Sequence, residues 1–136
     1  MLTISIPGAM RGKGRPRFTS AGGFARAYTD AKTANAETWV RSCAVDQTGG
    51  HVLDGPLSLT VEVGICPPAS WSKRRRADAL AGADAPTGKP DLDNVVKLIA
   101  DALNGIVWRD DKQIVHLVAR KFYAAQDGTT LRIAEA

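Results

Sequence analysis

The sequence predicts a domain of the α/β (α+β) class, in which a mixed or antiparallel sheet of about five or six strands is flanked by about three helices. Apolar residues alternate with period two in several segments, as they do in half-buried strands. One further segment repeats them at helical spacing. Short turns join some of the strands, and strands joined in this way run antiparallel. The 136 residues suffice for one domain with its own core, so a single domain over residues 1–136 is expected.

The first half of the chain is expected to form strands and one long helix. Leu2, Ile4 and Ile6 alternate at the start, and five apolar residues alternate between Leu57 and Ile65. The expected elements are a strand over residues 2–6, a Gly- and Arg-rich loop over 7–16, a hairpin over 17–28 that turns at 20–23, a helix from about 31 to 47 that Thr29 or Asp30 caps and Gly49-Gly50 ends, and a strand over 57–65.

The second half is expected to hold two helices and the remaining strands. Ser70 or Ser72 can cap a short basic helix that runs to about Leu80. A helical wheel over residues 93–104 places the apolar residues on one arc and the charged residues opposite. The expected elements are this pair of helices with a linker over 81–90 between them, Gly105 as the closing glycine of the second helix, a strand over 106–108, a turn over 109–112, and strands over 113–124 and 129–134.

The chain is basic, with a formal charge of +4 and a pI near 9.3, and its cations are bunched. One group lies before residue 30, and a second is the run Lys73-Arg74-Arg75-Arg76. Bunched cations favour nucleic acid over a small acidic metabolite as the partner. On composition alone, a solubilising run of surface charge explains them equally well.

No feature of the sequence predicts a membrane or secreted protein. No apolar run approaches the roughly 20 residues of a membrane span, and the N-terminus lacks the charged head and long apolar stretch of a signal peptide. Cys43 and Cys66 have no CxxC spacing, so neither a zinc site nor a disulfide framework is predicted. A soluble protein of the reducing cytoplasm is expected.

Acidic residues gather between Asp84 and Asp111, where six acids occur against three bases. Asp91 and Asp93 lie at the start of the expected helix over 93–104. A single aspartate there would be explained as a helix cap, but one cap suffices. On an extended segment the i, i+2 spacing points both side chains to the same side, where they can share a cation. Asp110-Asp111 fits a turn, yet either acid could close a site with the first two.

An all-carboxylate ligand set selects Mg²⁺, with Mn²⁺ as a substitute, over zinc. In phosphodiester hydrolysis such an ion lowers the pKa of its bound water and neutralises charge on the phosphate. Lys97 lies one turn after Asp93 and could donate to the phosphate or to the attacking water. It could equally form a simple i, i+4 pair with Asp93, and the spacing leaves both roles open.

Other kinds of site fit the sequence poorly. An EF-hand loop that started at Asp91 would put Val96 where glycine is needed. A two-carboxylate glycosidase would need sugar-stacking aromatic residues, and aromatic residues are only 6% of the chain. His51 and His116 are accompanied by no GxSxG serine, and the sequence contains neither a P-loop nor GxGxxG.

Three motifs follow one another in the acidic region: Lys89-Pro90-Asp91-Leu92-Asp93-Asn94-Val95-Val96-Lys97, Asp101-Ala102-Leu103-Asn104-Gly105, and Trp108-Arg109-Asp110-Asp111-Lys112-Gln113-Ile114. Together they closely resemble the core of the RusA-type Holliday junction resolvases. The segments Lys13-Gly14-Arg15-Pro16-Arg17 and Trp71-Ser72-Lys73-Arg74-Arg75 are similar to those of the phage and prophage branch of that family. The resemblance spans nearly the whole chain.

The resemblance implies a RusA-like fold and a homodimeric, Mg²⁺-dependent endonuclease of DNA recombination and repair. Such an enzyme cuts four-way DNA junctions by paired nicks and needs no small-molecule cofactor. By position in the motifs, the metal-binding catalytic acids are expected to be Asp91, Asp93 and Asp111, the essential lysine Lys97, and the supporting acids Asp101 and Asp110. No residue of the sequence indicates a preference for particular bases at the cut site.

The basic segments are expected to bind DNA through its backbone phosphates. The expected contacts are Lys13, Arg15, Arg17, Lys73, Arg74, Arg75 and Arg76. A two-fold dimer is expected because a four-way junction presents two equivalent strands to cut, and the strand over 57–65 and the helix over 31–47 are both candidates for its surface. Two other classes stay open: a catalytically silent junction-DNA-binding protein, and a metal-dependent phosphohydrolase of a small substrate.

Overall fold

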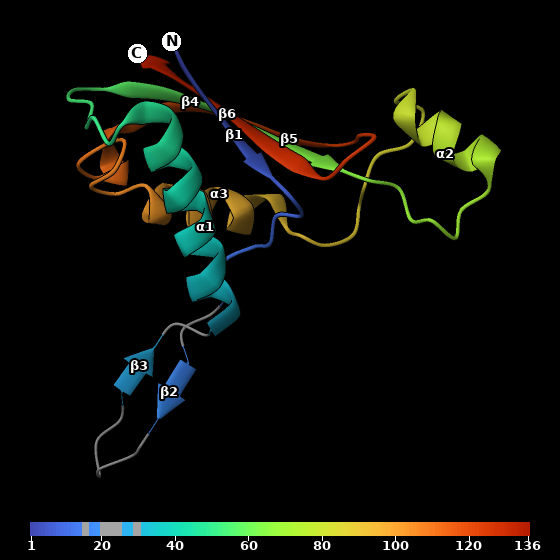
Figure 1. Ribbon diagram of the computed structural model, residues 1–136, viewed down its shortest axis with the longest axis horizontal. Coiled ribbons are helices and arrows are strands. Elements are labelled where there is room, and N and C mark those ends of the chain that lie inside the picture. Colours follow the sequence, from blue (N-terminus) through green and yellow to red (C-terminus); the bar gives the residue numbers. More distant parts are fainter. Residues whose placement is uncertain (15–16, 20–25, 29–30) are drawn as a thin grey trace.

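A computed structural model describes residues 1–14, 17–19, 26–28 and 31–136. Its centre is a four-stranded sheet in the order β1-β6-β4-β5 (Figure 1). The sheet is mixed, as expected. β1 and β4 each run antiparallel to β6, whereas β4 and β5 run parallel to each other. The strands are β1 (Leu2–Pro7), β4 (Leu57–Ile65), β5 (Ile114–Tyr123) and β6 (Gly128–Glu135). A separate antiparallel ribbon pairs β2 (Arg17–Thr19) with β3 (Arg26–Tyr28).

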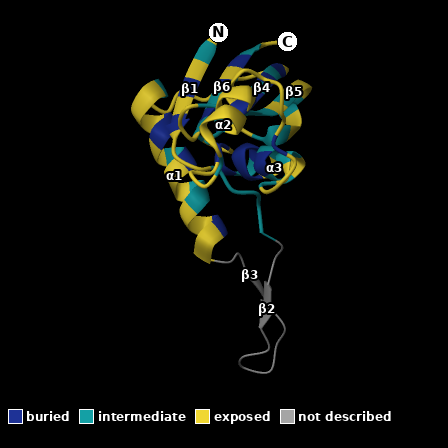
Figure 2. Cartoon of the chain, turned by 90° about the vertical axis from the view of Figure 1, so that its right-hand side faces the viewer, coloured by how far each residue is buried: buried dark blue, intermediate teal, exposed yellow. Residues whose placement is uncertain are grey.

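Two helices cover one face of the sheet, and a third lies apart from it. The helices are α1 (Ala31–Thr48), α2 (Lys73–Leu80) and α3 (Leu92–Ala102). Figure 1 shows α1 and α3 against the sheet and α2 beyond its end, reached by two extended segments. In Figure 2 the buried residues of α1 and α3 lie where these helices meet the sheet. The expected α+β class with three helices is therefore confirmed, although the described sheet has four strands rather than five or six, because β2 and β3 pair with each other as a separate ribbon.

Alternating residues explain which face of the sheet is covered. In β4 the residues Leu57, Leu59, Val61 and Val63 are buried, while the residues between them are partly exposed. These apolar side chains meet the apolar side of α3, whose Val95, Leu98 and Ile99 are fully buried. On the opposite face, Glu62 forms ion pairs with Arg120 and Arg132. The period-two and helical patterns of the sequence thus predicted the core correctly.

The expected strand over residues 106–108 is wrong. These residues form a turn, in which Val107 and Trp108 are buried and Trp108 makes only isolated bridges. Their backbone groups are taken locally: Gly105 N–H donates to Trp108 O at 2.7 Å, and Leu53 N–H donates to Val107 O at 2.7 Å. The Trp108 indole donates to Ala100 O and Asn104 Oδ1. These three residues therefore pack at the C-terminal end of α3 and do not form a strand.

Residues 109–112 consequently do not form a hairpin turn. They lead into a short 3₁₀ helix, η2 (Asp111–Gln113), which runs directly into β5. Because β4 and β5 are parallel, the chain between them must cross over, and α2 and α3 provide that connection. Smaller differences concern helix ends: α3 ends at Ala102 rather than Asn104, and Gly105, with φ +78°, lies two residues beyond the C-cap Leu103.

The expected hairpin over 17–28 corresponds to the β2–β3 ribbon, and Ser72 caps α2. The expected turn over 20–23 and the expected caps Thr29 and Asp30 lie outside the described residues. The strands over 2–6, 57–65, 113–124 and 129–134, the helix over 31–47 and the basic helix to Leu80 are found within a residue or two of their expected limits. Cys43 and Cys66 are both free thiols. Within the ranges that the structure describes, no helix has the length and apolar character that crossing a bilayer requires.

Candidate active site

A groove between α3 and the edge strand β5 contains three of the four residues expected to carry the chemistry. Asp93 and Lys97 from α3 and Asp111 from η2 line this cavity of about 710 Å³, together with apolar residues such as Leu92, Val96 and Leu117. We call it the α3–β5 groove. The helical spacing of Asp93 and Lys97 places both on the side of α3 that faces away from the core. The crossover topology then brings Asp111 beside them from the start of β5.

Asp91 lies at the opposite side of the first turn of α3. It is the N-cap residue, but its side chain makes no capping hydrogen bond. Instead its Oδ2 accepts a bond of 3.3 Å from Asn94 Nδ2, and Asp91 lines a second cavity of about 640 Å³. Helix capping therefore does not account for Asp91. The i, i+2 argument expected Asp91 and Asp93 to point to the same side, but Asp93 is already helical, so the two open into neighbouring cavities.

The carboxylates have the chemistry that a hard cation requires. Asp91 and Asp93 are exposed, Asp111 is half-buried, and none of the three forms an ion pair with another described residue. Their oxygen-only character suits Mg²⁺ or Mn²⁺. In the described part of the chain, however, no three acidic, histidine or cysteine side chains are close enough together to hold a metal ion. The donor type fits, while the arrangement brings only Asp93 and Asp111 to one groove.

A lysine of β5 holds the loop that leads into this site. Lys121 Nζ donates to Gly88 O at 2.8 Å and to Pro90 O at 3.0 Å, directly before Asp91. The Lys89-Pro90 peptide bond is cis. Lys121 was not singled out in the sequence, because it is 31 residues from Pro90 and belongs to no motif. Its partly buried position in the strand explains why it can reach these carbonyls.

Asp110 supports Asp111 by shaping the backbone. It caps η2, and its Oδ1 accepts a bond of 3.0 Å from Lys112 N–H. This backbone bond, followed by a bond with the Asp111 side chain, lowers the pKa of Asp110 below its ordinary value. Gln113 completes a capping box, and its amide nitrogen donates to Leu53 O and Gly55 O at 3.0 Å each. The sequence motif contains Gln113, but its anchoring role required knowledge of where residues 53–55 lie.

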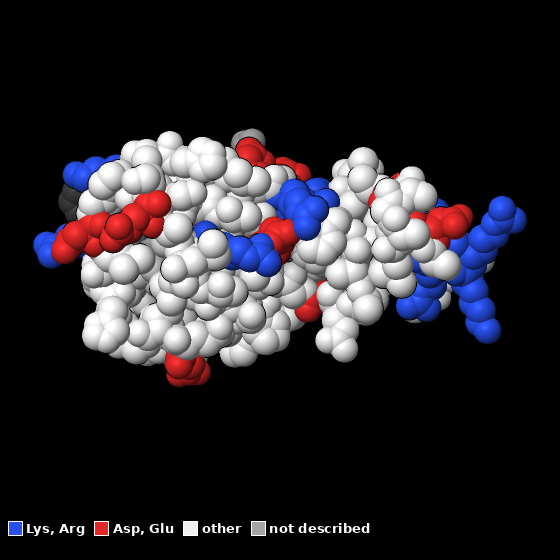
Figure 3. Space-filling view, turned by 90° about the horizontal axis from the view of Figure 1, so that it is seen from above, with Lys and Arg blue, Asp and Glu red and all other residues white. Residues whose placement is uncertain are grey.

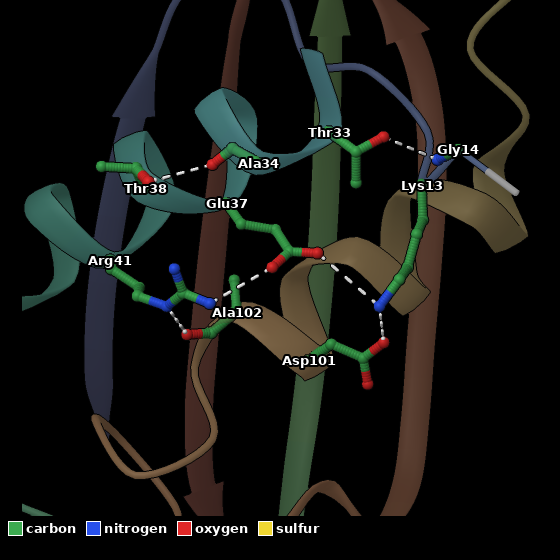
Figure 4. A network of polar contacts seen from close by, with 9 residues as sticks. All are labelled: Lys13, Gly14, Thr33, Ala34, Glu37, Thr38, Arg41, Asp101 and Ala102. Carbon is green, nitrogen blue, oxygen red and sulfur yellow. Dashed lines mark hydrogen bonds and ion pairs between the residues drawn. The ribbon is translucent and has the colours of Figure 1, made fainter. Parts of the chain in front are cut away.

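Asp101, the other expected supporting acid, belongs to a network of polar contacts that joins three segments (Figure 4). Lys13 Nζ contacts Asp101 Oδ2 and lies 3.6 Å from Glu37 Oε1. Glu37 also pairs with Arg41 at 3.2 Å, and Arg41 Nε donates to Ala102 O at 3.0 Å. We call this the Lys13 network. The two carboxylates raise the pKa of Lys13 although burial alone would lower it. The ammonium group expected to bind DNA is thus engaged within the protein.

The other expected DNA contacts are distributed differently. Lys73 to Arg76 lie on α2, where Ser72 accepts a capping bond from Arg75 N–H, and Figure 3 shows Lys and Arg side chains extending from that end of the molecule. The Arg75 guanidinium stacks on Trp71 at 3.5 Å, and Trp71 packs edge-on against Tyr123. Arg17 begins β2. Arg15 lies outside the described residues.

Comparison with known proteins shows the family of the chain. The model of the family described as "Endodeoxyribonuclease RusA" matches residues 7–134. The chain is also similar to the "Uncharacterized protein YqaN" of Bacillus subtilis (strain 168), with 32% identity over 136 residues that cover 98% of this chain and 96% of that protein. The family match includes α3, η2 and the acids that they carry. The chain therefore belongs to the RusA family of endodeoxyribonucleases, hydrolases that act on DNA.

Proposed function

We propose that this endodeoxyribonuclease resolves Holliday junctions by paired, symmetric nicks, and that it depends on Mg²⁺. The observation that carries the proposal is the α3–β5 groove, in which Asp93, Lys97 and Asp111 share one cavity. The family match supports a junction-resolving nuclease. The basic helix α2 supplies a cationic surface that a small phosphorylated substrate would not need.

In this proposal Asp93 and Asp111, which share the α3–β5 groove, would hold the metal together with Asp91, whose side chain must turn from the neighbouring cavity to reach it. When bound, the ion supplies a water of lowered pKa and neutralises phosphate charge. Lys97 lines the same groove as Asp93 and Asp111, so its ammonium group stabilises the negative charge that develops on the phosphate. Asp110 and Gln113 keep Asp111 in place through η2. Lys121 does the same for Asp91 through the carbonyls of residues 88 and 90.

We also propose that the functional unit is a two-fold dimer, because two symmetric nicks require two copies of the groove. β5 is the last strand of the sheet and exposes Val115, Leu117 and Val118. An edge strand with exposed apolar side chains is a surface that proteins usually cover. Of the two surfaces expected from the sequence, β4 is paired on both sides within the sheet, which leaves only its polar face. α1 exposes Trp39 and Val45 and stays a candidate.

The direct test replaces each acid with asparagine. Asp91→Asn, Asp93→Asn and Asp111→Asn should each abolish cleavage of a four-way junction in Mg²⁺ while leaving junction binding near normal, as measured by filter binding against linear DNA with and without Mg²⁺. Asp46→Asn, in the exposed part of α1, is the matched control and should cut normally. An asparagine variant that cuts at the wild-type rate would remove that residue from the mechanism. Binding without any cleavage by the wild type would indicate a silent DNA-binding protein instead.

A further inference from the structure

The second cavity, on the far side of the first turn of α3, has a chemistry of its own. It measures about 640 Å³ and lies between the loop of residues 9–14, the start of α1, the end of β4 and the segment before α3. Asp91 and Asn94 form its border with α3. We call it the Arg11 pocket. Since Asp91 opens into it and Asp93 opens into the α3–β5 groove, the two cavities flank the same helical turn.

The walls of the Arg11 pocket are fixed by hydrogen bonds. Lys13 N–H donates to Asn94 O at 3.0 Å, and Gly14 N–H donates to Thr33 Oγ1 at 2.9 Å. Gly12 lies so close to α3 that a Cβ there would be 2.7 Å from Asn94 Cβ. Only glycine allows this approach without a shift of the loop. The loop is therefore docked on the turn that carries the acids.

The Arg11 pocket carries a small excess of positive charge. Arg11, Lys32 and Lys89 line it, whereas the charge of Lys13 is neutralised by Asp101 and Glu37. Two carboxylates, Asp91 and Asp127, also line the pocket, so three cations face two anions. The Nε of Arg11 is buried and has no hydrogen-bond partner among the described residues. A buried donor without an acceptor is costly, and the Arg11 guanidinium forms no ion pair with another described residue, so its charge is available to an anion in the pocket.

We propose that the Arg11 pocket binds a backbone phosphate of the DNA strand that is being cut, next to the phosphate held at the acids. The proposal rests on the proposed function, because it takes DNA as the substrate. A phosphate suits the pocket since arginine donates to two of its oxygens at once and lysine adds charge. Contacts of this kind position a strand without reading its bases. Arg11, Lys32 and Lys89 are thus substrate-positioning residues beside the catalytic acids.

The first test measures junction binding in EDTA, where no cleavage occurs. We compare the wild type with Lys32→Gln and with the double variant Arg11→Gln, Lys32→Gln. Each lost phosphate contact should reduce the slope of log K against log [salt] by about 0.9 and weaken binding by about tenfold. Arg132→Gln, on the open face of the sheet, removes the same charge and should leave the slope unchanged. Lys32 is exposed, so its single variant should fold normally and keeps the test valid if the double variant does not.

The second test separates this proposal from the proposed function. With Mg²⁺ present, the Lys32→Gln variant should show a KM raised about tenfold with kcat within about threefold of the wild type, because the pocket positions the strand. Titration with thymidine 5′-monophosphate, followed by amide NMR shifts of Gly12 and Asn94, should show binding that both variants weaken. Nucleotide binding at these amides in a protein that cuts no junction would refute the proposed function but support the pocket. The proposed phosphate site would be refuted, and the proposed function kept, if both variants cut junctions normally and their salt slope, KM and nucleotide shifts matched those of the wild type.

Discussion

At the scale of single residues, the structure distinguishes the side chains that face the groove from those that hold them there. Asp93, Lys97 and Asp111 line the α3–β5 groove, whereas Asp110, Gln113 and Lys121 bond to the backbone around it. Loss of a groove residue should therefore affect the chemical step. Loss of a supporting residue should affect the placement of the acids and, with it, the stability of the local backbone.

Lys97 gives the clearest prediction at this scale. Lys97→Ala should slow junction cleavage by about a hundredfold or more, because removal of one preorganised charge donor costs on the order of 10²–10³ in rate. The thermal stability of the Lys97→Ala variant should differ little from that of the wild type, since Lys97 is exposed and forms no ion pair with another described residue. Single-turnover cleavage and a melting curve measure the two effects. A purely structural Lys97 would show normal turnover with a small loss of stability.

At the scale of elements, the Lys13 network attaches the N-terminal loop and α1 to α3. Lys13→Met should lower the free energy of unfolding by about 2 kcal/mol, because it leaves Asp101 partly buried without its cation. The double variant Lys13→Met, Asp101→Leu should recover part of the loss, since both charges are then absent. Denaturant unfolding of the two single variants and the double variant gives the coupling energy. Strictly additive losses would mean that the contact contributes nothing.

The same network predicts how stability depends on alkaline pH. The folded protein raises the pKa of Lys13 above its ordinary value of 10.5. A raised pKa means that this contribution is fully present below 10.5 and is lost as the pH rises through the folded-state pKa. The difference in stability between the wild type and Lys13→Met should therefore be constant at neutral pH and should shrink above pH 10.5. Urea unfolding across that range measures it.

The basic helix α2 leads to a prediction about DNA affinity. Arg74 is exposed, while the Arg75 guanidinium stacks on Trp71. Arg74→Ala should lower the slope of log K against log [salt] for junction binding by about 0.9, with no preference for sequence. Arg75→Ala should also disturb the packing of α2 on Trp71. An unchanged slope in the Arg74→Ala, Arg75→Ala double variant would mean that α2 faces away from DNA.

The elements also show what the sequence could and could not predict. α3 was predicted well because its apolar residues lie on a single arc, and β4 because its apolar residues alternate. The triplet Ile106-Val107-Trp108 has the composition of a strand but is too short to join the sheet, and local bonds with Leu53 and Gly105 decide its shape. Lys13 was expected to contact DNA because it lies in a basic segment. Its partner in the folded protein, Asp101, is 88 residues away in the sequence and could not be recognised there. Pairings over such separations depend on the fold and leave no local pattern.

At the scale of the whole molecule, the dimer is the main prediction. If the edge of β5 is the dimer surface, Val115→Lys should yield a monomer in sedimentation experiments at micromolar concentration, because charged edge strands resist association. Val45→Lys, on the exposed side of α1, is the matched variant and should remain dimeric. The reverse result would place the surface on α1. A wild-type monomer that still makes both nicks within one binding event would overturn the dimer altogether.

Strand β5 connects acids of the site with the proposed dimer surface. β5 continues directly from Asp111 at one end and, through Lys121, holds the loop before Asp91 toward the other. Asp111 and the loop before Asp91 are thus both attached to the strand whose outer edge the proposed partner would cover. We expect isolated subunits, with this strand uncovered, to be poor nucleases. At concentrations too low for the subunits to pair, the enzyme would then be inactive. A junction would therefore be nicked only by a dimer, which can make both nicks.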